Sequence, residues 1–321
     1  MTGISIRDAV ARSLEVLPEK FIARLKRDFD ATQTERILSA IALPGPRGVR
    51  FNTLKAEPAE TRSRLEKDGI PLEAVPWCDH ASVMDRAHMP AILKHPAWRD
   101  GSVHVQALPS IAVSLALAPK PGERVLDLCA APGGKTAHIA ALMENTGEIV
   151  ANDRSRTRCH RMRALLDTLG AKAAVRGSDG INIGHHEPMT FDRVLVDAPC
   201  SGEGRFTIDD ASTIDDWTVG KTRRLASLQK ALLHSAIHAT KPGGVIIYST
   251  CTYGREENEA VLERALERYG EGVNGVELEA IEVDLPGIDG AVFRSIPDPA
   301  GDHVAQAMEG FFIARLRRRR R

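Results

Sequence analysis

Hydrophobic and polar positions follow two different patterns along this chain, and the change comes near residue 110. In the first part apolar residues recur at helical spacing, a break rich in proline and glycine follows, and the next segment alternates like a strand. This pattern predicts a small α+β unit over residues 1–110. Its helices are expected at 5–16, 18–28, 32–41 and 57–69, and its strands at 48–54 and 71–77.

From residue 120 onward short apolar strands alternate with helical segments, which is typical of a parallel sheet covered by helices on both faces. Ligands bind such a sheet at the carboxyl ends of its strands. The pattern therefore predicts a second, α/β domain over residues 111–321. Its strands are expected at 123–129, 147–153, 173–179, 191–199, 243–251 and 310–317, and its helices at 135–143, 156–169, 220–240 and 256–270.

The composition is that of a soluble globular protein, with 43% hydrophobic and 27% charged residues in 321. No stretch approaches the ~20 apolar residues of a membrane span. The N-terminus lacks a long apolar core and carries Asp8 and Glu15, which argues against a signal peptide. We therefore expect a cytoplasmic protein without a membrane partner.

The formal net charge is zero, so overall charge does not indicate a nucleic-acid partner. Basic residues are nevertheless bunched locally, and such runs are more often solvated faces or tails than binding sites. On charge alone RNA binding stays open. The runs are Arg62 with Arg64, Arg154–Arg163, Lys221–Arg224 and Arg315–Arg321.

The cysteines are odd in number, scattered, and never spaced as CxxC, so a disulfide framework or a structural zinc site is not expected. His234 and His238 stand four apart on a predicted helix, but Ser235 replaces the glutamate of an HExxH site, and no metal is expected there. Most cysteines of this kind are small buried apolar residues, so a catalytic role must come from context. The cysteines are Cys78, Cys129, Cys159, Cys200 and Cys251.

The segment DLCAAPGGKT (127–136) joins a predicted strand to a predicted helix through two glycines. Such a turn lets the backbone approach a ligand closely, and the unsatisfied N–H groups of the helix favour a carboxylate or phosphate. It is not a P-loop, because the first glycine of GxxxxGK[ST] would fall at Cys129, and it is not GxGxxG. A purely structural turn is the alternative.

Acidic residues stand at the next two strand ends. Asp153 follows the glycines by about 20 residues, where a carboxylate can accept hydrogen bonds from both ribose hydroxyls of a nucleoside cofactor. Asp179 can accept from an adenine amino group. Singly, the first could be a helix N-cap and the second a turn aspartate. Together with the glycine turn they favour a nucleoside cofactor.

Two cysteines stand just past the ends of later strands, in DAPCSGEG (197–204) and STCT (249–252). Adenine amino-methyltransferases tend to carry Asp/Asn-Pro-Pro-aromatic at the first of these places, and here Ala198 and Cys200 replace its second and last residues. Amino nitrogens need no covalent activation, whereas carbon 5 of cytosine does. A thiolate must add to carbon 6 before carbon 5 can take a methyl group. The cysteine pair therefore indicates that chemistry.

Together these segments resemble the NOL1/NOP2/Sun family of RNA cytosine-5 methyltransferases, from about Arg50 to Arg317, and the bacterial-type ribosomal RNA enzymes are the most similar subgroup. The paired PC and TC cysteines are the specific part, because DNA cytosine-5 enzymes use only the PC position as nucleophile. The resemblance implies a Rossmann-like domain with a mostly parallel, seven-stranded sheet that depends on S-adenosylmethionine, preceded by a small α+β RNA-binding domain. It implies a monomer that acts on RNA, with rRNA as the first candidate and tRNA as the alternative.

The resemblance also implies roles for single residues. Cys251 attacks carbon 6, Cys200 assists breakdown of the covalent intermediate and release of RNA, and Asp197 lies between the methyl donor and the base. Asp153 and Arg158 bind the ribose of the cofactor. Asp179 binds its adenine. The methionine end is held by Cys129, Ala130, Ala131, Pro132, Gly133, Gly134 and Lys135.

The sequence departs from the family in VHVQALPSI (103–111), where Ala107 and Pro109 replace an acidic residue and a serine, so the start of a helix there is open. The chain ends soon after GFFIARL, and no appended C-terminal RNA-binding domain is expected. Two other functions stay open: methylation of another nucleobase or of a protein on the same fold, and a non-catalytic RNA-binding assembly factor.

Overall fold

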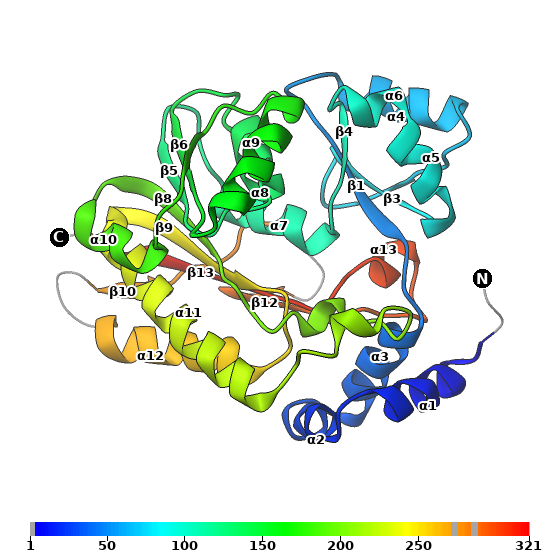
Figure 1. Cartoon of the computed structure of the whole chain (residues 1–321). Coiled ribbons are helices and arrows are strands. Elements are labelled where there is room, and N and C mark those ends of the chain that lie inside the picture. The colour runs from blue at the N-terminus through cyan, green and yellow to red at the C-terminus, as the bar shows by residue number, and fades with distance from the viewer. Residues whose placement is uncertain (1–3, 271–274, 284–287, 321) are drawn as a thin grey trace.

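The strands form two β-sheets in the computed structural model (Figure 1). The structure describes residues 4–270, 275–283 and 288–320. The smaller sheet is antiparallel and has the strand order β2-β3-β1-β4. Helices α4 (Pro58–Lys67), α5 (Met89–Lys94) and α6 (Pro96–Arg99) belong to this part. The strands are β1 (Arg47–Phe51), β2 (Glu73–Ala74), β3 (Ala81–Met84) and β4 (Val103–Val105).

The larger sheet has the order β11-β12-β13-β9-β8-β5-β6-β7, and β10 also pairs with β13. Strands β5 to β9 run parallel, whereas β13 is antiparallel to β9. The bounds are β5 (Arg124–Asp127), β6 (Glu148–Asn152), β7 (Ala174–Arg176), β8 (Phe191–Asp197), β9 (Thr240–Thr250), β10 (Val276–Leu278), β11 (Ile288–Asp289), β12 (Val292–Ser295) and β13 (Phe311–Arg318).

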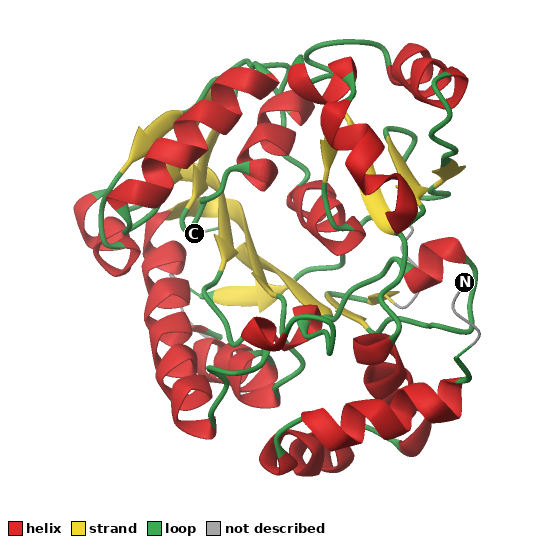
Figure 2. Cartoon of the chain, turned by 45° about the vertical axis from the view of Figure 1, so that its right-hand side comes forward, coloured by secondary structure: helices red, strands yellow, loops and turns green. Residues whose placement is uncertain are grey.

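Helices cover both faces of this sheet, because neighbouring residues of each strand point to opposite sides. Val125 of β5 packs with α7 (Leu108–Leu117), α8 (Gly134–Leu142) and α9 (Arg156–Leu169), whereas Leu126 packs with helices on the other face. Figure 2 shows these helical layers around the strands. The other face carries α10 (Ile183–His186), α11 (Val219–Ala239) and α12 (Glu259–Tyr269).

The predicted Rossmann-like α/β fold is confirmed. Among the described residues the sheet has nine strands, which is two more than the seven expected. Strands β10, β11 and β12 have only two to four residues each. A strand that short carries too few positions to show an alternating pattern, so the sequence did not predict them.

The first three helices do not pack on the smaller sheet. Helices α1 (Ile6–Val16), α2 (Glu19–Asp28) and α3 (Ala31–Ala42) share a hydrophobic core with the segment that leads into α11. The ring of Phe21 lies 5.3 Å from that of Phe206 and 5.6 Å from that of Trp217. In Figure 1 these helices, in dark blue, lie beside that segment. The N-terminal residues therefore divide between two hydrophobic clusters, one around the first three helices and one on the smaller sheet.

Helix α7 begins at Leu108, directly after the unusual Ala107, which makes no side-chain cap. Pro109 lies in the first turn, where a proline is accepted because its missing N–H would have no partner there. The helix contacts β1 of the smaller sheet and β9 of the larger sheet, so it connects the two domains whose boundary we propose at residue 110. Within the described ranges no helix is both long and apolar enough to cross a membrane.

Candidate active site

The carboxyl ends of the central strands open on a cavity of about 670 Å³. The glycine turn after β5 and the cysteines after β8 and β9 lie in the same cavity, although they come from distant parts of the sequence. Of the proposed site residues, the cavity is lined by Cys129, Ala130, Ala131, Pro132, Gly134, Lys135, Arg158, Asp197, Cys200 and Cys251. Gly133, Asp153 and Asp179 do not line it.

The glycine turn is shaped for close approach. Gly133 has a φ of 112°, which side-chain-bearing residues rarely adopt, and a Cβ on Gly134 would lie 3.3 Å from Nε2 of His104. Thr136 donates to the buried Asp127 at 2.7 Å and fixes the start of α8. No side chain caps this helix, so its first N–H groups are available to an anion.

Asp153 is 3% exposed and lies at the end of β6. Its Oδ1 accepts from the backbone N–H of Ser155 at 2.9 Å, and its Oδ2 lies 3.2 Å from Nη1 of Arg158. Arg158 also donates to the carbonyl of Ala131. The N-cap of α9 is Ser155, so the N-cap alternative for Asp153 is wrong. Each oxygen of the Asp153 carboxylate thus has one partner, and a carboxylate oxygen can accept from a second donor as well.

Asp179 is exposed, and its Oδ1 accepts from the N–H of Ile181 at 3.3 Å as the cap of a short 3₁₀ helix, Gly180–Asn182. The turn alternative therefore accounts for its contacts. Sequence reasoning missed the neighbouring Asn152, which is buried. Its Nδ2 donates to the carbonyls of Leu128 at 3.0 Å and Ser178 at 3.1 Å, so it ties three strand ends together.

The two cysteines lie against each other, with Sγ of Cys200 3.3 Å from Sγ of Cys251. The thiol of Cys200 lowers the pKa of Cys251, and the charges of Arg205 and Lys135 act in the same direction. The hydrogen bond to Cys251, together with burial, raises the pKa of Cys200 well above its ordinary value. The thiolate therefore forms more readily on Cys251, and a thiolate is the nucleophilic form.

Asp197 lies between the glycine turn and the cysteines. Its Oδ2 accepts from Nζ of Lys135 at 2.8 Å, and its Oδ1 accepts from Oγ of Ser249 at 2.9 Å. Lys135 also lies over the ring of Phe311, 5.4 Å from its centroid. The aspartate is thereby fixed between the two groups of residues.

A buried glutamate, Glu257, holds the loop that carries Cys200. It accepts from the backbone N–H of Ser201 at 3.0 Å, from the hydroxyl of Ser201, and from Nε2 of Gln229 at 2.8 Å. The same Gln229 nitrogen donates to the carbonyl of Pro199 at 2.8 Å. Burial raises the pKa of Glu257 to about 7. Both neighbours of Cys200 are therefore anchored to this network.

A second buried glutamate, Glu203, holds the loop after Cys251. It accepts from the N–H groups of Tyr253 and Gly254, each at 3.1 Å, and from Nε1 of Trp217 at 2.7 Å. It also pairs with Arg24 of α2. The N-terminal helices are thereby connected to the cysteine loops. A loop glutamate gives no signal in the sequence that would have predicted this.

The backbone itself is tightly packed where these loops meet β13. A Cβ on Gly204 would lie 1.9 Å from the carbonyl oxygen of Gly310, and a Cβ on Gly310 would lie 2.2 Å from Cζ of Tyr253. The N–H of Gly204 donates to the carbonyl of Cys251 at 3.0 Å. Only glycine fits at both positions without a rearrangement.

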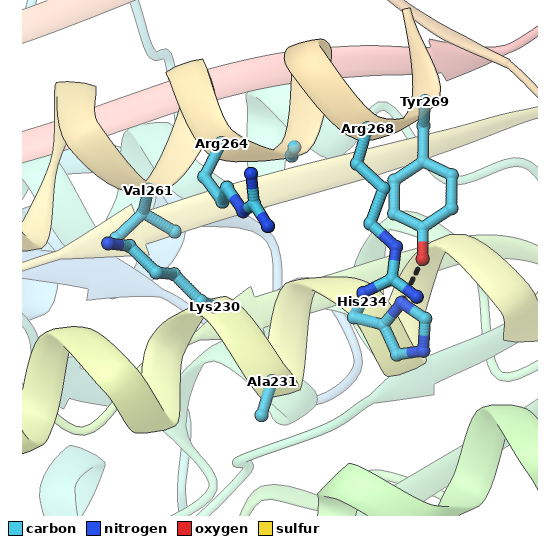
Figure 3. A pocket seen from close by; sticks show the side chains of 8 residues that line it. Lys230, Ala231, His234, Val261, Arg264, Arg268 and Tyr269 are labelled. Atoms are coloured by element: carbon cyan, nitrogen blue, oxygen red, sulfur yellow. Dashed lines mark hydrogen bonds between the residues drawn. The ribbon is translucent and has the colours of Figure 1, made fainter.

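A separate cavity of about 260 Å³ lies between α11 and α12, and no cysteine or strand-end residue lines it (Figure 3). Lys230, Arg264 and Arg268 surround it, and the hydroxyl of Tyr269 hydrogen-bonds to Nδ1 of His234. His234 and His238, which stand four residues apart on α11, thus both contact the hydroxyl of Tyr269. In the part of the chain that the structure describes, no three His, Cys, Asp or Glu side chains are grouped to hold a metal ion.

Comparison with known proteins decides the family. The protein-family model described as "16S rRNA methyltransferase RsmB/F" matches residues 114–317. A second family model, "N-terminal domain of 16S rRNA methyltransferase RsmF", matches residues 17–107. The chain belongs to the Sun/NOP2 family of rRNA methyltransferases. This confirms the family that the sequence predicted, and the Sun/NOP2 family is S-adenosylmethionine-dependent.

Individual Sun/NOP2 relatives cover almost all of the chain. Ribosomal RNA small subunit methyltransferase F of Klebsiella pneumoniae is 36% identical, over 96% of this chain and 65% of its own length. The protein of that name from Vibrio parahaemolyticus is 34% identical, over 94% and 63%. The chain thus spans 63–65% of these relatives. The solved methyltransferase homolog from Pyrococcus horikoshii is 31% identical over 97% of this chain and 98% of that one, with a TM-score of 0.78.

Proposed function

We propose that this chain transfers a methyl group from S-adenosylmethionine to carbon 5 of a cytosine in RNA, through a covalent bond between Cys251 and carbon 6. The observation that carries the proposal is the 3.3 Å separation of the Cys200 and Cys251 sulfurs, in the cavity that also holds the glycine turn. Two relatives are named rRNA small subunit methyltransferases, which supports rRNA as the substrate.

The cysteines divide the reaction into addition and elimination. Cys251, whose pKa is lowered, attacks carbon 6 and makes carbon 5 nucleophilic. S-adenosylmethionine supplies the electrophilic methyl group when bound. The proton on carbon 5 must then leave and the bond between Cys251 and carbon 6 must break, and Cys200 assists this second half. Asp197, which Lys135 and Ser249 hold in place, faces the space between methyl donor and base.

The residues present fit the cofactor. The segment from Cys129 to Lys135 approaches closely through its glycines, and the uncapped start of α8 suits the carboxylate of a methionine group. Asp153 and Arg158, which form an ion pair, bind the ribose in this proposal. Asp179, at the end of β7 and outside the cavity lining, is assigned to the adenine.

The test is methyl transfer in vitro. The purified chain is incubated with methyl-labelled S-adenosylmethionine and rRNA from a strain that lacks the gene, and the RNA is then digested to nucleosides. We expect the label in 5-methylcytidine, and none when the Cys251→Ala chain is used. Label in another nucleoside or in protein would favour a different methyltransferase, and RNA binding without transfer would favour an assembly factor.

A further inference from the structure

A smaller cavity of about 190 Å³ adjoins the catalytic one. Arg205 and Glu309 line both cavities, so they stand at the boundary between them. Arg47, at the start of β1, and Arg86, in a short 3₁₀ helix, line the smaller cavity from the side of the smaller sheet. The cavity therefore lies at the junction of that sheet and the Cys200 loop.

Three arginines, Arg47, Arg86 and Arg205, are among the residues that line this cavity. Glu309 is the only carboxylate in its lining, and its Oε1 lies 3.0 Å from Nη1 of Arg47. Arg86 and Arg205 make no hydrogen bond or ion pair through their guanidinium groups with any residue that the structure describes. Burial and the neighbouring charge of Arg47 lower the pKa of Arg86, while the charges of Asp209 and Glu309 act in the opposite direction.

We propose that this cavity binds a phosphate of the RNA strand next to the target cytosine. The inference rests on the proposed function, because it places the base in the adjoining catalytic cavity. Arg86 and Arg205 offer N–H groups without partners in the described structure, and a guanidinium can hold two phosphate oxygens at once. A base that enters the catalytic cavity brings the phosphates on either side of it along the same strand, so one of them passes the boundary at Arg205.

The experiment compares Arg86→Gln with Arg264→Gln, which makes the same charge change in the separate cavity between α11 and α12 (Figure 3). Arg264 is 62% exposed. Binding of a labelled single-stranded RNA that contains one cytosine is measured over a series of salt concentrations. Loss of one phosphate contact should reduce the slope of log affinity against log salt by about 0.7 in Arg86→Gln, whereas Arg264→Gln keeps the wild-type slope.

Arg86→Gln should also raise the KM for RNA about tenfold while kcat at saturating RNA stays close to wild type, since a phosphate contact positions the strand and does no chemistry. Arg86→Lys should keep the wild-type salt slope, because it keeps the charge, even though it loses the planar fork. If Arg86→Gln folds poorly, Arg86→Lys and Arg86→Glu are compared with each other instead. Arg86→Lys should then bind the RNA, whereas Arg86→Glu should not.

Two results would overturn the phosphate site. An unchanged salt slope in Arg86→Gln would remove the cavity from the RNA path. Equal losses in Arg86→Gln and Arg264→Gln would mean that the chain attracts RNA through its charge as a whole. The proposed function fails separately, when the wild-type chain transfers no methyl group to cytosine in RNA.

Discussion

The two halves of the catalytic cavity are built in different ways. The half that we assign to the cofactor consists of the turn after β5, where helix α8 starts without a side-chain cap, and of Arg158 from α9. The half with the cysteines consists of loops after β8 and β9 whose N–H groups are accepted by the buried Glu203 and Glu257. The first half leaves backbone donors free for a ligand, whereas the second uses its donors to fix the loops.

This difference follows from what each half has to do. Close approach to a ligand requires open N–H groups and no Cβ. Two sulfurs that act in sequence on one base require a fixed separation, and satisfied buried networks make a structure rigid. The comparison predicts that changes in the cysteine half disturb chemistry and stability, while changes in the cofactor half disturb affinity.

The largest effect is expected from the cysteines. Cys251→Ala removes the nucleophile, so turnover should fall by about 10³-fold or more and no covalent RNA complex should form. Cys200→Ala still allows attack and methyl transfer, but the adduct cannot break down. It should persist as an RNA–protein band in denaturing electrophoresis.

The reverse result would contradict these assignments. If the adduct were trapped by Cys251→Ala and lost in Cys200→Ala, Cys200 would be the nucleophile, as in the DNA enzymes. Unchanged turnover in both variants would leave both residues as small buried side chains.

The next effect concerns stability. Glu203→Ala leaves Arg24 buried without its main partner and removes the acceptor of two backbone N–H groups. We expect the free energy of unfolding to fall by about 3–5 kcal/mol, measured by urea denaturation. Glu256→Ala is the matched control, since this 37%-exposed glutamate also pairs with Arg24, and its loss should cost about 1 kcal/mol or less. Equal losses would argue against a special role for Glu203.

The two halves each contain a buried carboxyl whose pKa burial raises to about 7, Asp127 in one and Glu257 in the other. Their ordinary pKa values are 3.8 and 4.5. Between those values and about pH 7, the folded chain therefore holds protons on these carboxyls that the unfolded chain has released. Each carboxyl therefore lowers the free energy of unfolding as pH rises toward 7, by an amount of the order of a few kcal/mol.

Asp127→Asn and Glu257→Gln should each remove part of this pH dependence, measured by urea unfolding between about pH 4 and pH 8. An asparagine still accepts from Thr136, so at low pH Asp127→Asn should be about as stable as wild type. In Glu257→Gln, the amide NH₂ would face donors, because Ser201 and Gln229 direct three donors at this side chain. At low pH the free energy of unfolding of that variant should therefore be about 1–3 kcal/mol below that of the wild type. Stability curves parallel to that of the wild type would show that neither carboxyl titrates in this range.

The smallest effect is on the cofactor. Asp153→Ala should weaken S-adenosylmethionine binding by about 1–3 kcal/mol in a calorimetric titration, because a charged hydrogen bond is lost. Asp167→Ala, on the exposed side of α9, is the control and should leave affinity unchanged. Unchanged affinity in a folded Asp153→Ala chain would show that the ribose binds elsewhere.

The sequence predicted elements that carry local signals. Residues 156–169 were predicted as a helix and form α9 with those bounds, because Ser155 caps its start and Gly170, at a φ of 68°, ends it. The short strands β3 and β4 were missed, since three or four residues cannot show a period. The strand predicted at 71–77 is reduced to Glu73–Ala74.

For the candidate site, the sequence indicated which strand ends carry chemistry but not what holds them. The cysteines and glycines stand next to predicted strands, and parallel strands bring their ends together. The contacts of Glu203 with Arg24 and of Asn152 with Leu128 join residues that are 179 and 24 positions apart. A glutamate in a loop or an asparagine at the end of a strand is expected at the surface, so only the folded chain shows that these side chains are buried and paired.

The close backbone contact at Gly204 and Gly310 has a consequence for the proposed reaction. The Cys200 loop lies close against the residue before β13, with no room for a side chain, and is hydrogen-bonded to the Cys251 loop, so a movement of this loop would have to disturb both neighbours. In RNA methylation the cytosine itself must leave its stack, which costs a few kcal/mol in a paired helix and least in an unpaired strand. In the proposed reaction, a pocket whose loops are held in this way favours the cytosines that the surrounding RNA releases most easily.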